Sequence, residues 1–396
     1  MLVGIVGKAN VGKSTFFKAL TLADVLIANY PFATIKPNKG FGHVKIECAD
    51  KEFGVQCNPR FGYCHNGIRF VPVEVVDVAG LVPGAHEGKG MGNQFLDDLR
   101  QADVLIHVVD IAGTTNEKGE PVDPGSYDPE FDVKFLEFEL DMWYLSIIKK
   151  GWEKSARQVH QEGGDINKVL GKQLSGLGVT EELVKQIINK LALPPNPTIW
   201  AEEQLFKLAT ALRKETKPLL IAANKIDVAG AMQNLERVKK NNPERIIIPC
   251  SAESELALKE AARKGLISYI PGDNTFKISG TLSDRQKQAL EFIQKNVLDK
   301  LGSTGVQQTI NIAVLDFLKF IAIFPGGVNK LADQHGNVLP DCFMMPPEST
   351  ALDFAFKLHT DLGNKFIRAI DVKTKRVVGR EHQLKHRDVV EIITSR

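Results

Sequence analysis

The chain has 396 residues, a formal net charge of +2 and 43% hydrophobic residues. This length is too great for one ordinary core and predicts two or three domains, while the near-neutral charge by itself indicates no acidic partner. No run of about 18 apolar residues occurs and the N-terminus lacks the layout of a signal peptide, so we expect a cytoplasmic protein with no membrane partner. The five cysteines are too few for a disulfide-stabilised scaffold.

The first predicted element is a buried strand, LVGIV, which leads through a glycine-rich turn into the helix-compatible STFFKAL. Residues 7–14 fit the pattern G-x-x-x-x-G-K-[ST], in which backbone N–H groups converge on phosphate oxygens at a helix N-terminus. Lys13 would reach the β- and γ-phosphates, and the Ser14 hydroxyl would ligate Mg²⁺. The nucleotide-binding residues predicted here are Gly7, Lys8, Ala9, Asn10, Val11, Gly12, Lys13, Ser14 and Thr15.

A cysteine cluster follows, in the segment IECADKEFGVQCNPRFGYCHNG. Cys48, Cys57, Cys64 and His65 are soft ligands that could hold Zn²⁺. The spacing is poor for such a site, because Cys64 and His65 are adjacent and no C-x-x-C occurs. Zinc binding and a Cys57–Cys64 disulfide stay open as alternatives, and we expect unliganded thiols.

Three later strands end in polar residues: VEVVDVAG at 73–80, PLLIAANKID at 218–227 and RIIIPCSAE at 245–253. In an open parallel sheet, ligands bind at the carboxyl ends of the strands, so these residues should gather beside the phosphate loop. The Asp77 carboxylate can hold the water shell of Mg²⁺, and the Gly80 N–H can sense a γ-phosphate. The last strand ends in Ser251, Ala252 and Glu253, which we also expect at the nucleotide.

Asn224, Lys225 and Asp227 are the predicted readers of the base. The Asp227 carboxylate only accepts hydrogen bonds, so it suits the ring N–H and exocyclic amine of guanine, whereas adenine presents a lone pair there. A site built for such bonds rejects the mismatched ligand by about 10⁴–10⁵. We therefore expect GTP and GDP as ligands, with the Lys225 stem over the base face and the Ala252 N–H on the guanine oxygen.

More than a hundred residues separate Asp110 from the Asn224 strand, and they predict an inserted helical subdomain at 115–215. Residues 117–141 carry nine Asp/Glu and two Lys. Apolar residues then follow helical spacing around 184–191 and 205–212, and LPPNPT at 193–198 separates the two helices. The insert is either a partner-binding arm or cover for one flank of the sheet. A helical connector follows at 281–309, where Ser283 and Gln286 form a predicted capping box.

The C-terminal segment from residue 310 is basic: residues 357–396 hold ten Lys/Arg and five Asp/Glu. Such positive charge attracts phosphate backbones, so RNA or ribosome contact is one interpretation and a solvated basic face is the other. The basic residues concerned are Lys365, Arg368, Lys373, Lys375, Arg376, Arg380, Lys385 and Arg387.

Taken together, these motifs resemble the translation-factor-type P-loop GTPases, and more closely the Obg-like group that includes the YchF type. The resemblance rests on GKANVGKSTFFKAL, NYPFATIKPNKG at 29–40, DVAGLVPGAHEGKGMGNQFLDDLRQADVLIHVVD at 77–110, NKID, CSA and a C-terminal segment like a TGS domain. It implies an α/β P-loop NTPase sheet flanked by helices, at 1–114 and 216–280. It also implies a TGS-like β-grasp domain at 310–396, with one helix near 350–362 that Gly363 stops.

The resemblance also implies roles in the reaction. Ser14, Thr34 and Asp77 would form the magnesium environment, and Lys13, Thr34, Gly80 and Asn10 would act in catalysis. Leu81 stands where Ras-like GTPases carry the glutamine that orients the attacking water, so hydrolysis would need another group or a partner. Asn10 resembles members in which K⁺ supplies the missing positive charge, although it could simply cap its loop. His86 could position water, but a solvated loop histidine is the simpler interpretation.

The functional prediction is a GTP-hydrolysing molecular switch linked to the ribosome or RNA. One alternative is an RNA- or ribosome-binding protein whose nucleotide is structural. Another is an ATPase, because YchF-type relatives resemble ATPases with Glu at the base-reading position; here Asp227 is intact, which favours GTP.

Overall fold

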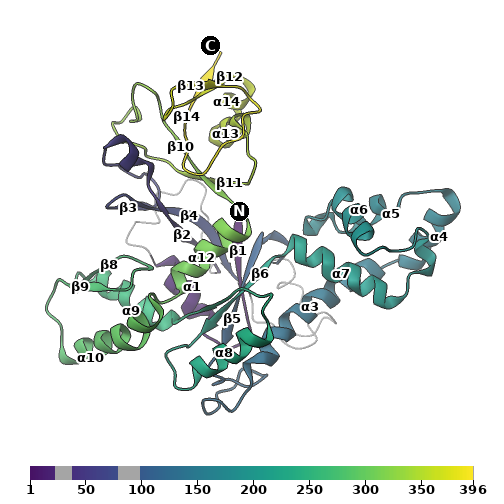
Figure 1. Cartoon of the computed structure of the whole chain (residues 1–396), viewed down its shortest axis with the longest axis horizontal. Helices are drawn as coiled ribbons and strands as arrows, with labels where there is room; N and C mark the ends of the chain where they lie inside the picture. The colour runs from purple at the N-terminus through teal and green to yellow at the C-terminus, as the bar shows by residue number, and fades with distance from the viewer. Residues whose placement is uncertain (23–37, 79–98, 396) are drawn as a thin grey trace. The chain divides into compact units, whose positions relative to one another are not determined.

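The computed structural model describes residues 1–22, 38–78 and 99–395 (Figure 1). Thr34, Gly80, Leu81 and His86 therefore lie outside the described residues. The chain divides into two compact units, the first made of Met1–Ala19 and Val75–Val306 and the second of Leu20–Glu74 and Gln307–Arg396. Within the described ranges, no helix is long and apolar enough to cross a bilayer. The domain boundaries that the sequence predicts at 114, 215, 280 and 309 stay predictions.

The first unit is built on a sheet in the order β4-β1-β5-β6-β7, to which β4 contributes residues 75–77. β5 is parallel to β1 and to β6, and β6 is parallel to β7. β1 is apolar throughout and β5 is largely apolar, and both strands are buried along their length, as expected for strands covered on both faces. The strands are β1 (Leu2–Val6), β4 (Ile68–Asp77), β5 (Val104–Asp110), β6 (Leu219–Asn224) and β7 (Ile247–Pro249).

Helices cover this sheet, which confirms the predicted α/β class. α8 packs with β5, β6 and β7 in one apolar cluster that includes Leu235, Ile221 and Ile247. α9 lies beside α1, where the Lys259 ammonium donates to the Ala19 carbonyl at 2.7 Å. α10 begins with the predicted capping box of Ser283 and Gln286. The elements are α1 (Lys13–Thr21), α8 (Ala231–Asn241), α9 (Ala252–Arg263), β8 (Ile267–Tyr269), β9 (Phe276–Ile278), α10 (Asp284–Ile293) and α11 (Asp299–Leu301).

A helical arm extends from the sheet, formed by two long helices that run side by side and three shorter ones at their far end (Figure 1). Its core continues the apolar cluster of the sheet through Leu140, Tyr144 and Leu208. Trp152 stacks on Trp200 with ring centroids 5.4 Å apart and closes the far end. The arm consists of α3 (Pro129–Lys149), α4 (Trp152–Glu162), α5 (Ile166–Gln173), α6 (Glu181–Lys190) and α7 (Glu202–Thr216).

A buried ion pair joins the two long helices. The Arg213 Nε donates to Asp141 Oδ1 at 2.7 Å, and the Thr210 hydroxyl donates to Asp141 Oδ2 at 2.9 Å. Arg213 is 2% exposed and Asp141 is 7% exposed. Removing one partner of such a pair leaves the other charge buried without compensation.

We therefore expect Asp141→Ala to lower the free energy of unfolding of the arm by about 3 kcal/mol. All three tryptophans of the chain, Trp143, Trp152 and Trp200, lie in this arm, so tryptophan fluorescence during urea unfolding reports on it selectively. Glu203→Ala is the matched control, because it removes a carboxylate from an exposed pair with Lys207. Equal urea midpoints for the two variants would contradict the assigned role of the pair.

The second unit contains a hairpin and a separate five-stranded sheet. β3 pairs antiparallel with β4, and β2 is the next strand beside β4. The other sheet has the order β11-β10-β14-β12-β13, with β10 parallel to β14 and the remaining pairs antiparallel. The elements are β2 (Lys39–Glu47), β3 (Tyr63–His65), α12 (Val306–Asn311), β10 (Ile321–Pro325), β11 (Phe343–Met345), α13 (Ala351–Leu358), α14 (Thr360–Asn364), β12 (Phe366–Asp371), β13 (Arg376–Val378) and β14 (Val389–Thr394).

The β-grasp prediction for the C-terminal segment is confirmed, with one correction to its helix. The single helix expected near 350–362 is two, because His359 is extended at φ −165° and ends α13. Gly363 does not stop a helix but lies within α14. A Cβ there would lie 2.3 Å from the Phe356 ring, so this glycine allows the ring to pack closely.

Candidate nucleotide-binding site

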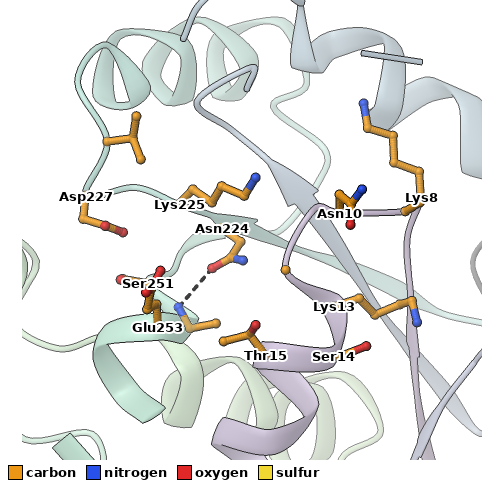
Figure 2. A pocket seen from close by; sticks show the side chains of 14 residues that line it. Lys8, Asn10, Lys13, Ser14, Thr15, Asn224, Lys225, Asp227, Ser251 and Glu253 are labelled. Carbon is orange, nitrogen blue, oxygen red and sulfur yellow. Dashed lines mark hydrogen bonds between the residues drawn. The ribbon is translucent and has the colours of Figure 1, made fainter. Parts of the chain in front are cut away.

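A pocket of about 550 Å³ opens at the carboxyl ends of the parallel strands in the first unit (Figure 2). This volume lies in the usual range for small-molecule sites. The residues that line it come from the turn after β1, the start of α1, the turn after β6 and the start of α9. They are Lys8, Ala9, Asn10, Gly12, Lys13, Ser14, Thr15, Asn224, Lys225, Asp227, Val228, Ser251, Ala252 and Glu253.

The turn between β1 and α1 needs its two glycines for space as well as conformation. Gly7 has φ +153°, and a Cβ there would lie 2.6 Å from the Val108 carbonyl oxygen. Gly12 has φ +91°, and its Cβ would lie 2.3 Å from Asn224 Nδ2. Neither Gly7 nor the fully buried Val11 lines the pocket. These two predicted residues therefore support the conformation of the loop and do not face the pocket.

Lys13, Ser14 and Asp77 lie together at the start of α1. The Lys13 ammonium is 2.5 Å from Asp77 Oδ1, and the Ser14 hydroxyl donates to Asp77 Oδ2 at 3.2 Å. A hydroxyl and a carboxylate at the N-terminus of a helix form the oxygen donor set that Mg²⁺ prefers. The residues present therefore fit a magnesium ion, with Ser14 and Asp77 as its holders in this part of the chain.

The Lys8 side chain turns away from the pocket, as Figure 2 shows. Its ammonium pairs with Asp132 at 2.7 Å, donates to the Thr115 carbonyl at 3.0 Å and lies 3.9 Å from the Tyr127 ring centroid. Burial raises the pKa of Asp132, and its hydrogen bond to the Lys8 ammonium opposes that shift. The Lys8 side chain therefore connects the loop to the segment after β5.

Asn10 contacts the same segment from the other side of the loop. It has φ 60°, a left-handed conformation that asparagine tolerates better than most residues. Its Nδ2 donates to the Gly119 carbonyl at 2.9 Å, which leaves Oδ1 as the atom available to a cation. A Cβ on Gly119 would lie 2.7 Å from the Ala9 carbonyl oxygen, so the segment packs tightly over the loop.

Asn224 connects two parts of the pocket. Its Nδ2 donates to the Val11 carbonyl at 2.9 Å. Its Oδ1 accepts from the Ala252 N–H at 3.0 Å, the bond drawn as a dashed line in Figure 2. The Ala252 N–H that we expected at the guanine oxygen is therefore already paired with Asn224. The Asn224 side chain therefore fixes the position of the phosphate loop relative to the start of α9.

Asp110 is a site residue that the sequence interpretation did not assign. The Lys225 ammonium lies 2.9 Å from Asp110 Oδ2 and donates to the Thr114 hydroxyl at 2.9 Å. Asp110 is 1% exposed and also accepts from the Thr115 hydroxyl at 3.0 Å. The signal was present in the sequence, since Asp110 ends an apolar strand at the same edge as Asp77 and Asn224.

The remaining predicted residues lie at other positions around the pocket. Asp227 and Glu253 line it, as does Thr15 of α1. The Ser251 hydroxyl caps α9, accepting from the Ser254 N–H at 3.4 Å. Thr34 and Gly80 lie outside the described residues. The structure brings together the phosphate loop, Asp77 and the predicted base readers.

Models of known protein families match three parts of the chain. The Obg-like GTPase YGR210-like, G4 motif-containing domain matches residues 222–327. The 50S ribosome-binding GTPase matches residues 2–131, and the TGS domain matches residues 334–394.

Several known proteins match two thirds or more of the chain. A GTP-binding protein of Methanocaldococcus jannaschii is 50% identical over 395 residues, which cover 100% of this chain and 99% of that protein. The ribosome-binding ATPase YchF of Bacillus subtilis is 32% identical and covers 67% of this chain and 69% of its own. The crystal structure of a GTP-binding protein from Pyrococcus horikoshii OT3 is 40% identical, covers 100% of each chain and has a TM-score of 0.77. This chain therefore belongs to the Obg-like family of P-loop GTP-binding proteins and carries a C-terminal TGS domain.

Proposed function

We propose that this protein binds GTP with Mg²⁺ in the pocket described above, hydrolyses it to GDP and phosphate, and acts as a molecular switch that contacts the ribosome or RNA. The observation that carries the proposal is one pocket lined by both Lys13 and Asp227. The first residue suits the phosphates and the second suits guanine. A single nucleotide that contacted both residues would be GTP or GDP, and this supports the proposal.

The reaction is in-line attack of water on the γ-phosphate. Lys13 contacts the β- and γ-phosphates and stabilises the charge that develops on them. Ser14 and Asp77, with Thr34, would hold Mg²⁺, which would neutralise phosphate charge. The Lys13–Asp77 pair of this structure must separate for both roles, because the ammonium and the ion compete for the same carboxylate.

The proposal extends to the site's response to the γ-phosphate. Thr34 and the Gly80 N–H would order on the triphosphate and be released after hydrolysis, as in other GTPase switches. Leu81 carries no group that orients water, so turnover would be slow without a partner or K⁺. Asn10 supports a role for K⁺, since its Oδ1 stays available while its Nδ2 is fixed to Gly119.

We expect K⁺ to raise the rate of GTP hydrolysis relative to Na⁺ at equal ionic strength, and Asn10→Ala to abolish this difference. Phosphate release measures both rates, and ribosomes are then added to the same assay. Stimulation by K⁺ or by ribosomes supports the switch. Turnover that neither one raises would contradict it and favour a structural nucleotide in an RNA-binding protein.

The proposed ribosome or RNA contact rests on the basic residues of the C-terminal domain. Two of them are neutralised within the second unit: Arg387 pairs with Glu47 and Glu52, and Lys373 pairs with Glu52. The other six are exposed and have no ion pair in the described part of the chain: Lys365, Arg368, Lys375, Arg376, Arg380 and Lys385. Their charge would give salt-sensitive attraction to a phosphate backbone.

Co-sedimentation with ribosomes tests this contact, with the full chain bound either to a GTP analogue or to GDP. A switch predicts more binding in one nucleotide state than in the other, and weaker binding at higher salt. The name of the Bacillus subtilis relative, a ribosome-binding ATPase, supports the choice of ribosomes as the partner to test. Equal sedimentation in both states would separate ribosome binding from the nucleotide cycle.

A further inference from the structure

We propose that Cys48, Asp50, Cys57 and Cys64 form a structural zinc site in the second unit. Cys48 follows β2, Asp50 lies in the short 3₁₀ helix Ala49–Phe53, Cys57 lies in the connection after it, and Cys64 is on β3. One ligand atom from each of the four residues lies within 4.8 Å of the others. This convergence involves four separate points along the segment, so no single turn accounts for it.

The distances between these atoms suit a common metal ion. Cys48 Sγ and Cys57 Sγ are 3.6 Å apart, far beyond a disulfide bond of about 2.05 Å. With Zn–S bonds of about 2.3 Å, the edge of a tetrahedron between two sulfurs is about 3.8 Å. Cys64 Sγ lies 3.8 Å from Asp50 Oδ2, and a mixed sulfur–oxygen edge is about 3.5 Å.

The Asp50 carboxylate in this cluster is buried and only partly hydrogen-bonded. Asp50 is 1% exposed, and its Oδ1 has no hydrogen-bond partner. Its Oδ2 accepts from the Cys57 backbone N–H at 3.2 Å, which fixes the side chain toward the sulfurs. A buried carboxylate left without full compensation is costly, and a metal ion among these ligands would remove that cost.

Arg69 supplies positive charge next to the sulfurs. It is fully buried, and its Nη1 donates to Cys57 Sγ at 3.6 Å. No ion pair joins Arg69 to Asp50 among the described residues. Three thiolates and one carboxylate around Zn²⁺ carry a net charge of −2, which the guanidinium lowers to −1. In such sites, an N–H group commonly donates a hydrogen bond to a thiolate that binds the metal.

The donor set selects the metal. Three thiolates exclude Mg²⁺ and Ca²⁺, which prefer oxygen ligands, and four protein ligands complete the tetrahedral shell of Zn²⁺. Because no position remains open for water, the site would be structural. His65, which the sequence offered as the fourth ligand, is exposed and does not belong to the cluster. Successive side chains of β3 point to opposite faces, so Cys64 and His65 cannot both face it.

The metal would order a segment that has little regular structure. Between β2 and β3 the described chain has one 3₁₀ helix of five residues. This segment meets the C-terminal domain within the same unit: the Asn58 N–H donates to the Val338 carbonyl at 2.8 Å, and the Arg60 N–H to the Pro340 carbonyl at 2.9 Å. Arg69 adds donation to the Leu339 and Pro340 carbonyls at 3.1 and 2.8 Å. Zinc binding would therefore stabilise this contact.

Metal analysis of the full-length protein, purified under reducing conditions, tests the site. We expect one equivalent of zinc per chain in the wild type and in Cys250→Ser, which removes a buried thiol from the first unit. Cys57→Ser and Cys64→Ser should lose the zinc. Asp50→Asn should weaken zinc binding at least tenfold, while Asp50→Cys should retain zinc because a fourth thiolate replaces the carboxylate.

A second measurement covers variants that fail to fold. After a chelator has removed the zinc, Co²⁺ is added to the wild-type protein. Thiolate-to-cobalt charge-transfer absorption together with the intense visible bands of tetrahedral cobalt would support the site. Wild-type protein that contains no zinc and gives no such spectrum would overturn the proposal, as would a disulfide among Cys48, Cys57 and Cys64 found by mass spectrometry of protein kept under reducing conditions.

Discussion

Asp227→Asn is expected to weaken GTP binding by about 10²–10⁴-fold and to improve the binding of xanthosine triphosphate. The Asp227 carboxylate would accept two hydrogen bonds from guanine, and each bond to a charged group contributes about 1.5–3 kcal/mol. Asparagine keeps one acceptor but places an N–H donor at the other position. Xanthine has a carbonyl oxygen where guanine has its amine, so the donor finds a partner again.

Displacement of labelled GDP by GTP, xanthosine triphosphate and ATP measures this change. Glu236→Gln is the matched control, because it removes one negative charge from an exposed position on α8 without touching the pocket. An unchanged order of nucleotides in Asp227→Asn would show that another residue reads the base. Displacement by ATP as effective as by GTP in the wild type would favour the ATPase alternative.

Lys13→Ala is expected to slow GTP hydrolysis by at least about 10²–10³-fold, the usual effect of removing one group that stabilises developing charge. The Lys13 side chain is 13% exposed at the N-terminus of α1, where the helix dipole already favours phosphate. Its loss should weaken GTP binding more than GDP binding, since only GTP offers a γ-phosphate. It also leaves the Asp77 carboxylate without its cationic partner.

Single-turnover phosphate release and binding of fluorescent nucleotides separate the two effects of this change. Lys18→Ala on the same helix is the control, because Lys18 is exposed and does not line the pocket. If Lys13→Ala hydrolysed GTP at the wild-type rate, the proposed phosphate contact would be wrong.

Much of the candidate site could be predicted because its geometry is local in the chain. The turn from Gly7 to Ser14 is fixed by eight consecutive residues. Asp77, Asn224 and Ser251 each follow a strand, and parallel strands bring their carboxyl ends to one edge. Local sequence pattern also predicted two helices of the arm, because the apolar residues around 184–191 and 205–212 repeat with helical spacing.

Contacts between distant residues were harder to predict. Lys8 belongs to the phosphate-loop motif, yet its side chain pairs with Asp132, more than a hundred residues away. Asp110 was not assigned a role, although the structure makes it the partner of Lys225. In the C-terminal domain, Gly363 was read as a helix stop, whereas the Phe356 ring explains its lack of a side chain.

The sequence by itself determined the family resemblance and predicted the nucleotide class, because a carboxylate at Asp227 and a Gly-Lys-Ser turn have only a few chemical uses. Only the tertiary structure decided which side chains share a site with partners remote in the chain. The cysteine cluster shows the physical reason. Spacing suggested His65 as the fourth ligand, but strand alternation turns it outward, and the buried Asp50 takes the place beside the three sulfurs.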